Sequence, residues 1–395
     1  MVINNLGRYI PKGLIKNNNI IAKKGVGCWI WDKYDTKYLD MTSGIGALST
    51  GHSHPNVINR VKKQLDNIVH AQQNCFYSHC EQEILIKKMI EILPNNHDNI
   101  FFTNSGSEAT DNAIKIARMS TSKPNVIAIN GCFHGRTLAA MSITSSKISY
   151  RKGFQPLIPG VFFCNSYTKE GIDNILNNQT SPDETCAIIM EPIIGEGGII
   201  KLPDEFVKYV REICTKHNIK LIFDEVQCGS GRTGKWWASE HFDITPDIMT
   251  FAKGIGSGFP IGGVSANNEL FNKMTKNSLG GTYNGNVIST SACIATIDTI
   301  LEEKLLENAE LMGLKLKRDL KDMLYVKEVR QYGLFIAIEV LEYIDVNIII
   351  KMALKNNLIM ISCGNNSLRI IPPLTINEKE VDIFIDKLYR TMAMI

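Results

Sequence analysis

The middle of the chain alternates short apolar segments with segments that have the apolar spacing of amphipathic helices. Six apolar segments, rich in Ile, Val and Phe, predict β-strands at residues 99–104, 125–130, 186–191, 219–225, 247–252 and 261–266. Apolar side chains recur every three or four positions over residues 108–119 and 204–217, which predicts helices there. Strands that alternate with helices predict an α/β fold, in which helices cover both faces of a mainly parallel sheet.

The pattern changes near residue 288, where a long helical stretch to about Met323 precedes short strands and helices. We interpret residues 288–395 as a smaller α+β domain and residues 46–287 as the large domain that holds the strands. Residues 1–45, with short strands predicted at 25–31 and 37–39, are expected to pack with the small domain. A length of 395 residues fits two domains, since a single core stops growing at roughly 250–300 residues.

Composition excludes several classes of function. Lys and Arg number 43 against 40 Asp and Glu, so a formal charge of +3 gives no electrostatic reason to expect nucleic acid or an anionic membrane as a partner. No apolar run reaches the ~20 residues that span a bilayer. The N-terminal residues have no apolar signal core and no Arg/Ser-rich amphipathic helix, so we expect no secretory or organelle signal. The ten cysteines form no C-x-x-C pair or zinc spacing. We therefore expect a cytoplasmic protein with reduced thiols and no metal site.

Candidate chemistry lies where the predicted strands end, because ligands of such sheets bind beyond the carboxyl ends of the strands. Gly106 and Ser107 follow the first strand at a helix start, where free N–H groups suit a phosphate; the alternative is an ordinary serine helix cap. Phe133 and Arg136 follow the second strand. The ring can stack on a flat group and the guanidinium can bind a carboxylate, although a lone loop arginine is usually solvated.

The next three strands end in carboxylates and an amine. Glu191 and Glu196 follow the third strand among glycines, and Asp224 directly follows the apolar fourth strand. A buried aspartate needs a cation or hydrogen-bond donors, and a protonated ring nitrogen would serve. Lys253 ends the fifth strand, where burial would lower its pKa and make the amine a nucleophile suited to a Schiff base. The alternative is a surface lysine that extends its ammonium into solvent.

Residues 229–235, GSGRTGK, match two nucleotide-binding patterns, G-x-G-x-x-G and G-x-x-x-x-G-K. We interpret both matches as accidental. The phosphate loop needs Ser or Thr after the lysine to bind magnesium, and Trp236 stands there. The dinucleotide loop belongs to the first strand–helix–strand unit, whereas this segment lies in the middle of the chain.

The strand-end residues fit one cofactor when they are combined. Pyridoxal phosphate needs a Schiff-base lysine, an acid at its pyridine nitrogen, a phosphate cup and an apolar sandwich. The sequence offers, in that order, Lys253, Asp224, Gly106 with Ser107, and Phe133 with Val226. This conjunction is far more specific than any of its members.

Over nearly its whole length, from the IPKG at residues 10–13 to Arg369 and the PPL that follows it, the chain resembles the class III (ω-amino acid) aminotransferases of pyridoxal-phosphate fold type I. The motifs are SGSEA at 105–109, FHGRT at 133–137, EPIIGEGG at 191–198, DEVQ at 224–227, GRTGK at 231–235, AKGIGSGFP at 252–260 and GGTYNGN at 280–286. By this resemblance Lys253 forms the Schiff base and Asp224 keeps the ring nitrogen protonated.

The resemblance also implies the remaining cofactor contacts. Gln227 contacts the ring hydroxyl, while Phe133 stacks on one face of the ring and Val226 packs on the other. Gly106, Ser107 and Thr282 bind the phosphate. Thr282 is expected to reach the site of the neighbouring subunit, which implies a homodimer.

Within the family the chain is most similar to 4-aminobutyrate aminotransferases, with Ile45 where ornithine aminotransferases have tyrosine. Acetylornithine and ornithine aminotransferases stay open as alternatives. By resemblance, Arg136 binds the carboxylate far from the reacting amine and Arg369 binds the one next to the reacting carbon. Glu196 is expected to pair with Arg369 while an ω-amine reacts and to swing away when 2-oxoglutarate binds. Glu191 is the second candidate for this gate.

Three further interpretations stay open at this point. The same cofactor can serve a decarboxylase or an aminomutase, although the presence of both Arg136 and Arg369 argues against these. A nucleotide-binding protein is disfavoured by Trp236. A non-catalytic protein that has kept the fold is disfavoured by the intact set of Lys253, Asp224 and Arg136.

Overall fold

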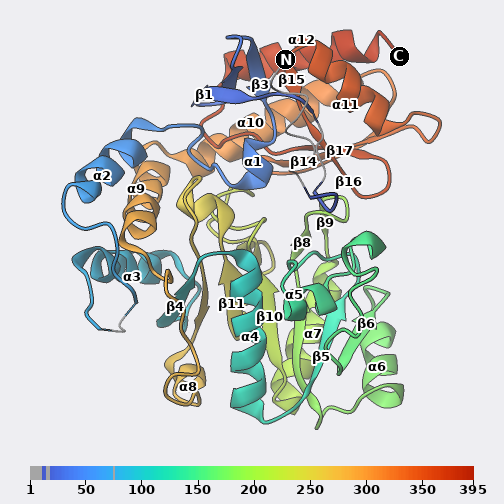
Figure 1. Ribbon diagram of the computed structural model, residues 1–395. Coiled ribbons are helices and arrows are strands. Elements are labelled where there is room, and N and C mark those ends of the chain that lie inside the picture. The colour runs from blue at the N-terminus through green and yellow to red at the C-terminus, as the bar shows by residue number, and fades with distance from the viewer. Residues whose placement is uncertain (1–10, 15–17, 74–75) are drawn as a thin grey trace.

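Strands from the middle of the chain form a seven-stranded sheet, in the lower half of the view in Figure 1. The computed structural model describes residues 11–14, 18–73 and 76–395, so Ile10 of the IPKG segment lies outside the described residues. The strands, in spatial order, are β4 (Asn99–Thr103), β12 (Gly262–Ala266), β11 (Ile248–Phe251), β10 (Lys220–Asp224), β7 (Thr185–Met190), β5 (Asn125–Ile129) and β6 (Val161–Cys164). All are parallel except β12, which runs antiparallel to both β4 and β11. The predicted α/β fold with a mainly parallel sheet is confirmed.

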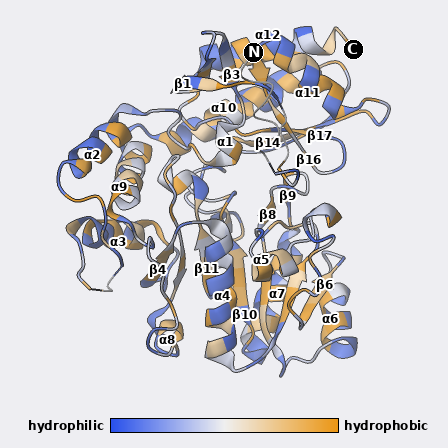
Figure 2. Ribbon diagram, in the orientation of Figure 1, coloured by the Kyte–Doolittle hydropathy of each residue, from blue (hydrophilic) through white to orange (hydrophobic). Residues whose placement is uncertain are grey.

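The six predicted strands are all present, but the edge strand β6 was not predicted. Helices cover both faces, because alternate side chains of each strand point to opposite sides. Ile127 and Ile188 pack with α6 (Lys169–Asn178) and α7 (Asp204–His217). Val126 and Ile189 pack on the other face with α4 (Gly106–Thr121) and α5 (Leu138–Ile143). Figure 2 shows the apolar strands between helices that are polar on their outer sides.

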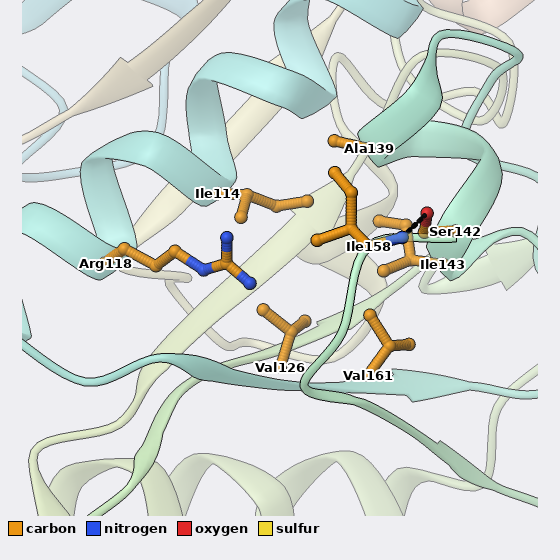
Figure 3. Close-up of a pocket in the computed structure, with 8 residues that line it drawn as sticks. All are labelled: Ile114, Arg118, Val126, Ala139, Ser142, Ile143, Ile158 and Val161. Carbon is orange, nitrogen blue, oxygen red and sulfur yellow. Dashed lines mark hydrogen bonds between the residues drawn. The ribbon is translucent and has the colours of Figure 1, made fainter. Parts of the chain in front are cut away.

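A small pocket between α4, α5 and the starts of β5 and β6 is apolar (Figure 3). Val126 and Val161, at the amino-terminal parts of their strands, line it, and Arg118 is its one charged lining residue. The Oγ of Ser142 accepts a hydrogen bond from the N–H of Ile158 at 3.0 Å across its edge. This pocket lies far from the carboxyl ends of the strands and belongs to the packing of the sheet.

The C-terminal part forms a second sheet, in the order β13 (Val326–Tyr332), β14 (Phe335–Val340), β17 (Ser367–Ile370) and β16 (Ile361–Cys363), with antiparallel pairing throughout. Its helices are α10 (Leu305–Leu320), α11 (Val346–Lys355) and α12 (Glu378–Met392). The N-terminal strands are β1 (Ala22–Val26), β2 (Trp29–Asp32) and β3 (Lys37–Asp40), and β3 pairs with β15 (Leu358–Ile359) from the C-terminal part. Leu39 and Met41 share a core with Leu316 and Phe384.

Two sequence predictions in these outer parts were wrong. The strand predicted at 25–31 is a hairpin, in which Val26 pairs with Trp29 and Gly27, at φ +55°, turns the chain. The long helix predicted after residue 288 is two helices, α9 (Val287–Glu302) and α10, because Lys304 adopts a left-handed conformation at φ +53°.

The helix α9 begins at Val287, next to the predicted domain boundary at residue 288, and contacts helices from both sides of that boundary. It packs against α2 (Pro55–Leu65) and α3 (Cys80–Ile92) from the preceding segment, and also contacts α10. The boundaries at 46 and 288 stay predictions.

The remaining elements are α1 (Ser43–Gly46), η2 (Ile148–Tyr150), β8 (Ile193–Ile194), β9 (Ile200–Lys201), η3 (Ala238–His241), η4 (Lys253–Gly256) and α8 (Asn268–Phe271).

Three further findings concern the described residues as a whole. None of the described helices combines the length and apolar character needed to cross a membrane. The cysteines that the structure describes, all except Cys75, are free thiols. No group of three or more His, Cys, Asp or Glu side chains within the described ranges is placed to hold a metal ion.

Candidate active site

Lys253 and Asp224 lie at the carboxyl ends of neighbouring strands. Asp224 is the last residue of β10 and pairs in register with Thr250 of β11. Lys253 follows β11 by two residues, is half-buried, and opens η4 with φ at +51°. A left-handed conformation is unfavourable for a lysine, and strained residues of this kind cluster at functional sites.

The surroundings of Lys253 shift the pKa of its amine. Burial lowers its pKa from the ordinary value, and the carboxylates of Asp224 and Glu191 oppose that shift. A lowered pKa increases the neutral fraction of the amine near pH 7, which is the form that attacks a carbonyl carbon or accepts a proton.

The carboxylate of Asp224 is held by three groups. It is 2% exposed, and its Oδ2 lies 2.7 Å from the Nδ1 of His134. Its Oδ1 accepts hydrogen bonds from the hydroxyl of Thr250 at 3.2 Å and from the N–H of Val226 at 3.1 Å. In the tautomer that carries a proton on Nδ1, the imidazole of His134 donates to this carboxylate. The buried Nε2 of His134 has no partner among the described residues.

Glu191 ties two loops of the site together. Its Oε1 accepts from the N–H of Phe133 at 2.7 Å and its Oε2 from the N–H of Gly195 at 2.9 Å. Burial, reinforced by the nearby charge of Asp224, raises the pKa of Glu191 to about 7. Because both carboxylate oxygens of Glu191 bind backbone N–H groups in this structure, its predicted contact with substrate stays a prediction.

The start of α4 lies at the end of β4 and faces Val226. The N–H groups of Gly106 and Ser107 belong to the first helical turn, so they have no acceptor within the helix. The hydroxyl of Ser107 accepts a hydrogen bond from the N–H of Arg136 at 3.2 Å. A Cβ on Gly106 would lie 2.8 Å from a methyl of Val226, so only glycine allows this approach. Such a helix start suits a phosphate.

An aromatic pair lies beside the exposed guanidinium of Arg136. The rings of Phe133 and Tyr150 meet edge to face with centroids 5.1 Å apart. The guanidinium carbon of Arg136 lies 5.8 Å from the first ring centroid and 5.9 Å from the second. Tyr150, on η2, was not among the predicted site residues.

Arg369 is a buried cation that pairs with no carboxylate of the described residues. It lies on β17, is 5% exposed, and donates from Nη1 to the Oε1 of Gln227 at 3.1 Å. Its buried Nε has no hydrogen-bond partner among the described residues. Gln227 is thus engaged by Arg369, and its predicted contact with the cofactor stays a prediction. An uncompensated buried charge is costly, so this arginine is suited to receive an anion.

Glu196 does not pair with Arg369 in this structure. Its Oε1 accepts from the hydroxyl of Tyr150 at 2.5 Å and lies 3.3 Å from the Nζ of Lys147. The side chain predicted to neutralise Arg369 is therefore held by two residues, Lys147 and Tyr150, that were not predicted from the sequence.

The two remaining predicted residues lie at the surface. Ile45 is 49% exposed and adopts φ +65°, which a β-branched residue rarely does. Thr282 is exposed in the turn before α9, a turn joined to the end of β4 by a 2.6 Å hydrogen bond between Asn104 and Asn284.

The segment 229–235 packs inside the protein rather than forming an open loop for a nucleotide. Arg232 is almost fully buried, and its Nη1 donates to the carbonyl oxygens of Leu334 at 3.1 Å and Pro372 at 2.5 Å. A Cβ on Gly229 would lie 2.7 Å from the Trp237 ring, so this glycine allows close packing.

A family model described as "Aminotransferase class-III" matches residues 14–392. The chain belongs to the class III aminotransferases. It is 36% identical to the acetylornithine aminotransferase of Archaeoglobus fulgidus, over 92% of this chain and 93% of that one. It is 35% identical to a 5-aminovalerate aminotransferase of Pseudomonas aeruginosa, over 94% and 93%. Among solved structures, an omega transaminase from Pseudomonas jessenii in complex with PMP superposes with a TM-score of 0.91 at 26% identity, over 100% of this chain and 98% of that chain.

This aminotransferase is a pyridoxal-phosphate enzyme of fold type I. The described residues fit that cofactor on their own chemistry. A buried carboxylate at Asp224 suits a protonated ring nitrogen, and a half-buried amine at Lys253 suits an aldehyde. The free N–H groups at the start of α4 suit a phosphate.

Proposed function

We propose that this aminotransferase moves the terminal amino group of an ω-amino acid to 2-oxoglutarate, giving an aldehyde and glutamate. The best candidate donor is 4-aminobutyrate, which is one methylene shorter than the donor named for the Pseudomonas aeruginosa relative. The observation that carries the proposal is the buried guanidinium of Arg369, which has only the neutral amide of Gln227 as a side-chain partner among the described residues.

Two arginines in different settings suit two kinds of substrate. 2-Oxoglutarate has two carboxylates, one for the exposed Arg136 and one for the buried Arg369. An ω-amino acid has a single carboxylate far from its amine, which we assign to Arg136. Arg369 then needs another anion while the ω-amine reacts, and we assign that role to Glu196.

We assign the chemistry to Lys253 and Asp224. When bound, pyridoxal phosphate supplies an aldehyde that takes up the amino group and a ring that withdraws electrons from the reacting carbon. The lowered pKa of Lys253 lets its Nζ accept a proton from that carbon and return it. Asp224, fixed by His134 and Thr250, holds a proton on the ring nitrogen.

The remaining assignments concern cofactor binding. The start of α4, with Gly106 and Ser107, binds the phosphate through its free N–H groups. Phe133 and Val226 cover the two faces of the ring. Gln227 reaches the ring hydroxyl once Arg369 binds an anion and releases the amide oxygen of Gln227.

A homodimer completes this proposal, with Thr282 binding the phosphate in the neighbouring subunit. Thr282 is exposed, and its neighbour Tyr283 is 64% exposed. Tyr77, at 56%, and Phe76, at 85%, are further exposed aromatic side chains that suit an interface. A molar mass near twice that of one chain in light scattering is the expected result.

Acetylornithine or ornithine is the second candidate donor. The similarity to the Archaeoglobus fulgidus acetylornithine aminotransferase favours it, since that relative matches over 92% of this chain. A non-catalytic protein of the same fold is the third possibility. It would be supported by a purified protein that is colourless and stays so after incubation with pyridoxal phosphate.

A donor panel tests the proposal. The holoenzyme is assayed for glutamate formed from 2-oxoglutarate with 4-aminobutyrate, 5-aminovalerate, β-alanine, ornithine, acetylornithine or putrescine. We expect the highest kcat/KM with 4-aminobutyrate. A clear preference for acetylornithine would transfer the assignment to the alternative, and glutamate formation with none of the donors would overturn the proposed function.

A further inference from the structure

Lys147 directly precedes the short helix η2, Tyr150 is the last residue of that helix, and both contact the same carboxylate. The hydroxyl of Tyr150 donates to Oε1 of Glu196 at 2.5 Å, and the Nζ of Lys147 lies 3.3 Å from that oxygen. The side chain of Glu196 is only 13% exposed, whereas that of Lys147 is 43% exposed. Glu196 is thus held by a hydroxyl and a cation that have no part in the assignments above.

Hydrogen bonds hold the backbone around Glu196, so a change of partner is left to its side chain. Its carbonyl oxygen accepts a hydrogen bond from the N–H of Gly364 at 2.8 Å, and the preceding N–H, of Gly195, is fixed on Glu191. Gly364 directly follows β16, which pairs with the strand that carries Arg369. The backbone of Glu196 is therefore joined to the end of β16, in the sheet that carries Arg369, while its carboxylate contacts Lys147 and Tyr150.

We propose that Lys147 and Tyr150 form a docking position for the carboxylate of Glu196 that leaves Arg369 free to bind the carboxylate of a 2-oxoacid. This inference rests on the proposed function and adds two specificity-determining residues to it. The phenol stays a donor throughout the neutral range, because burial and the contact with Glu196 raise the pKa of Tyr150 to about 12. Glu196 then has two partners in competition, η2 and Arg369.

This competition predicts the sign of each substitution. Lys147→Met removes the cation but keeps the length of the side chain, and Tyr150→Phe removes the hydroxyl but keeps the ring against Phe133. Each weakens the docked position, so Glu196 spends more time on Arg369. Ligands that need Arg369 then bind more weakly, whereas ligands that do not need it are unaffected or bind more tightly.

Binding of two unreactive acids to the holoenzyme tests the proposal by calorimetry. Glutarate has two carboxylates and engages both arginines, while pentanoate has one and engages Arg136 alone. For Lys147→Met we expect glutarate to bind about two- to fivefold more weakly, the effect of one half-exposed ion pair. For Tyr150→Phe we expect about tenfold, since a hydrogen bond to a charged group is stronger. Pentanoate should not weaken in either variant.

Two controls separate the docking role from simpler roles. Lys152→Met removes an exposed lysine of the same loop and should leave both constants unchanged. In a Glu196→Ala background, Lys147→Met should have no further effect, because no carboxylate is left to dock. An equal loss of glutarate affinity in that background would mean that Lys147 binds the ligand directly, and would overturn the proposal.

Unchanged glutarate binding in both single variants would overturn it too. The binding test is independent of turnover. Wild-type enzyme that binds glutarate but forms glutamate from no donor would refute the proposed function, while the effect of Lys147→Met and Tyr150→Phe on binding would still decide the docking role.

Discussion

The two ends of the active site are built in different ways. At the proposed cofactor end, Asp224 and His134 are each 2% exposed, and Oδ2 of the first lies 2.7 Å from Nδ1 of the second; Asp224 ends β10, and His134 lies in the loop after β5. At the substrate end, Arg136 is exposed, and Lys147 and Tyr150 come from a loop and a three-residue helix. The side chains of the buried end have a single set of hydrogen-bond partners. At the exposed end, we propose two alternative partners for Glu196, which are the residues at η2 and Arg369. In our proposal, residues held by the sheet carry the chemistry and residues of the loops select the substrate.

The largest effect is expected from Lys253→Ala at the buried end. We expect glutamate formation to fall to background, since we assign to no other amine the attachment of the cofactor's aldehyde carbon. Borohydride reduction of the wild-type holoenzyme, followed by peptide mapping, should place the cofactor on Lys253. Lys235→Ala, which removes an exposed lysine, is the matched control and should retain activity. A label on any lysine other than Lys253 would refute the assignment.

Asp224→Asn should lower kcat by about 100- to 1,000-fold, the range for loss of one preorganised electrostatic contact in a buried site. The neutral amide cannot stabilise a positive charge on the ring nitrogen, although it keeps the size of the side chain. Single-turnover rates with the best donor measure the effect, and Asp322→Asn, at a side chain 85% exposed, is the control. Near wild-type turnover in Asp224→Asn would show that the DEVQ motif has been misinterpreted.

The positions of Asp224 and Lys253 at neighbouring strand ends could be predicted from the sequence, because both residues come at the end of apolar segments. Asp224 and Lys253 end such segments, and parallel strands bring their carboxyl ends to one edge of the sheet. The contact of His134 with Asp224 was missed, since it joins residues 90 positions apart and depends on strand order. The resemblance to the family supplied Thr282 and Ile45, which lie at the surface of the chain.

The exposed end could not be predicted in the same way. Lys147 and Tyr150 lie in a polar segment without helical or strand periodicity, and nothing local marks them as partners of Glu196. Their contacts depend on where the loop after α5 returns to the sheet. Likewise, the strand predicted at 25–31 had to be a hairpin once Gly27 adopted a positive φ, which periodicity alone does not reveal.

The buried framework also predicts a dependence of stability on pH. Glu225, next to Asp224, is fully buried, and burial raises its pKa to about 7 from the ordinary value of 4.5. Between these values the unfolded chain has released the proton and the folded chain has kept it, so this group makes stability fall as pH rises. Its contribution is complete below pH 4.5 and is lost through about pH 7, by up to about 3 kcal/mol.

Glu225→Gln tests this contribution, because the amide cannot ionise. Urea unfolding at pH 5, 6, 7 and 8 should give a flatter profile in this variant than in wild type, whatever its absolute stability. Glu302→Gln, at an exposed position, should keep the wild-type slope. Equal slopes in Glu225→Gln and wild type would mean that Glu225 is ionised throughout, and that the buried end is more hydrated than its geometry implies.

The smallest effect tests the exposed end, with opposite signs for two substrates. In Glu196→Ala, Arg369 stays free in both half-reactions. Glutamate carries a carboxylate for Arg369 and should react at least as fast as with wild type. An ω-amine carries none, and an uncompensated charge in a buried site costs about 1–3 kcal/mol, so its single-turnover rate or affinity should fall about tenfold. The ratio of the two rates is the measured quantity, because it cancels any general loss of folding or cofactor. An unchanged ratio would remove Glu196 as the gate and leave Glu191, whose oxygens bind the backbone of Phe133 and Gly195, as the next residue to substitute.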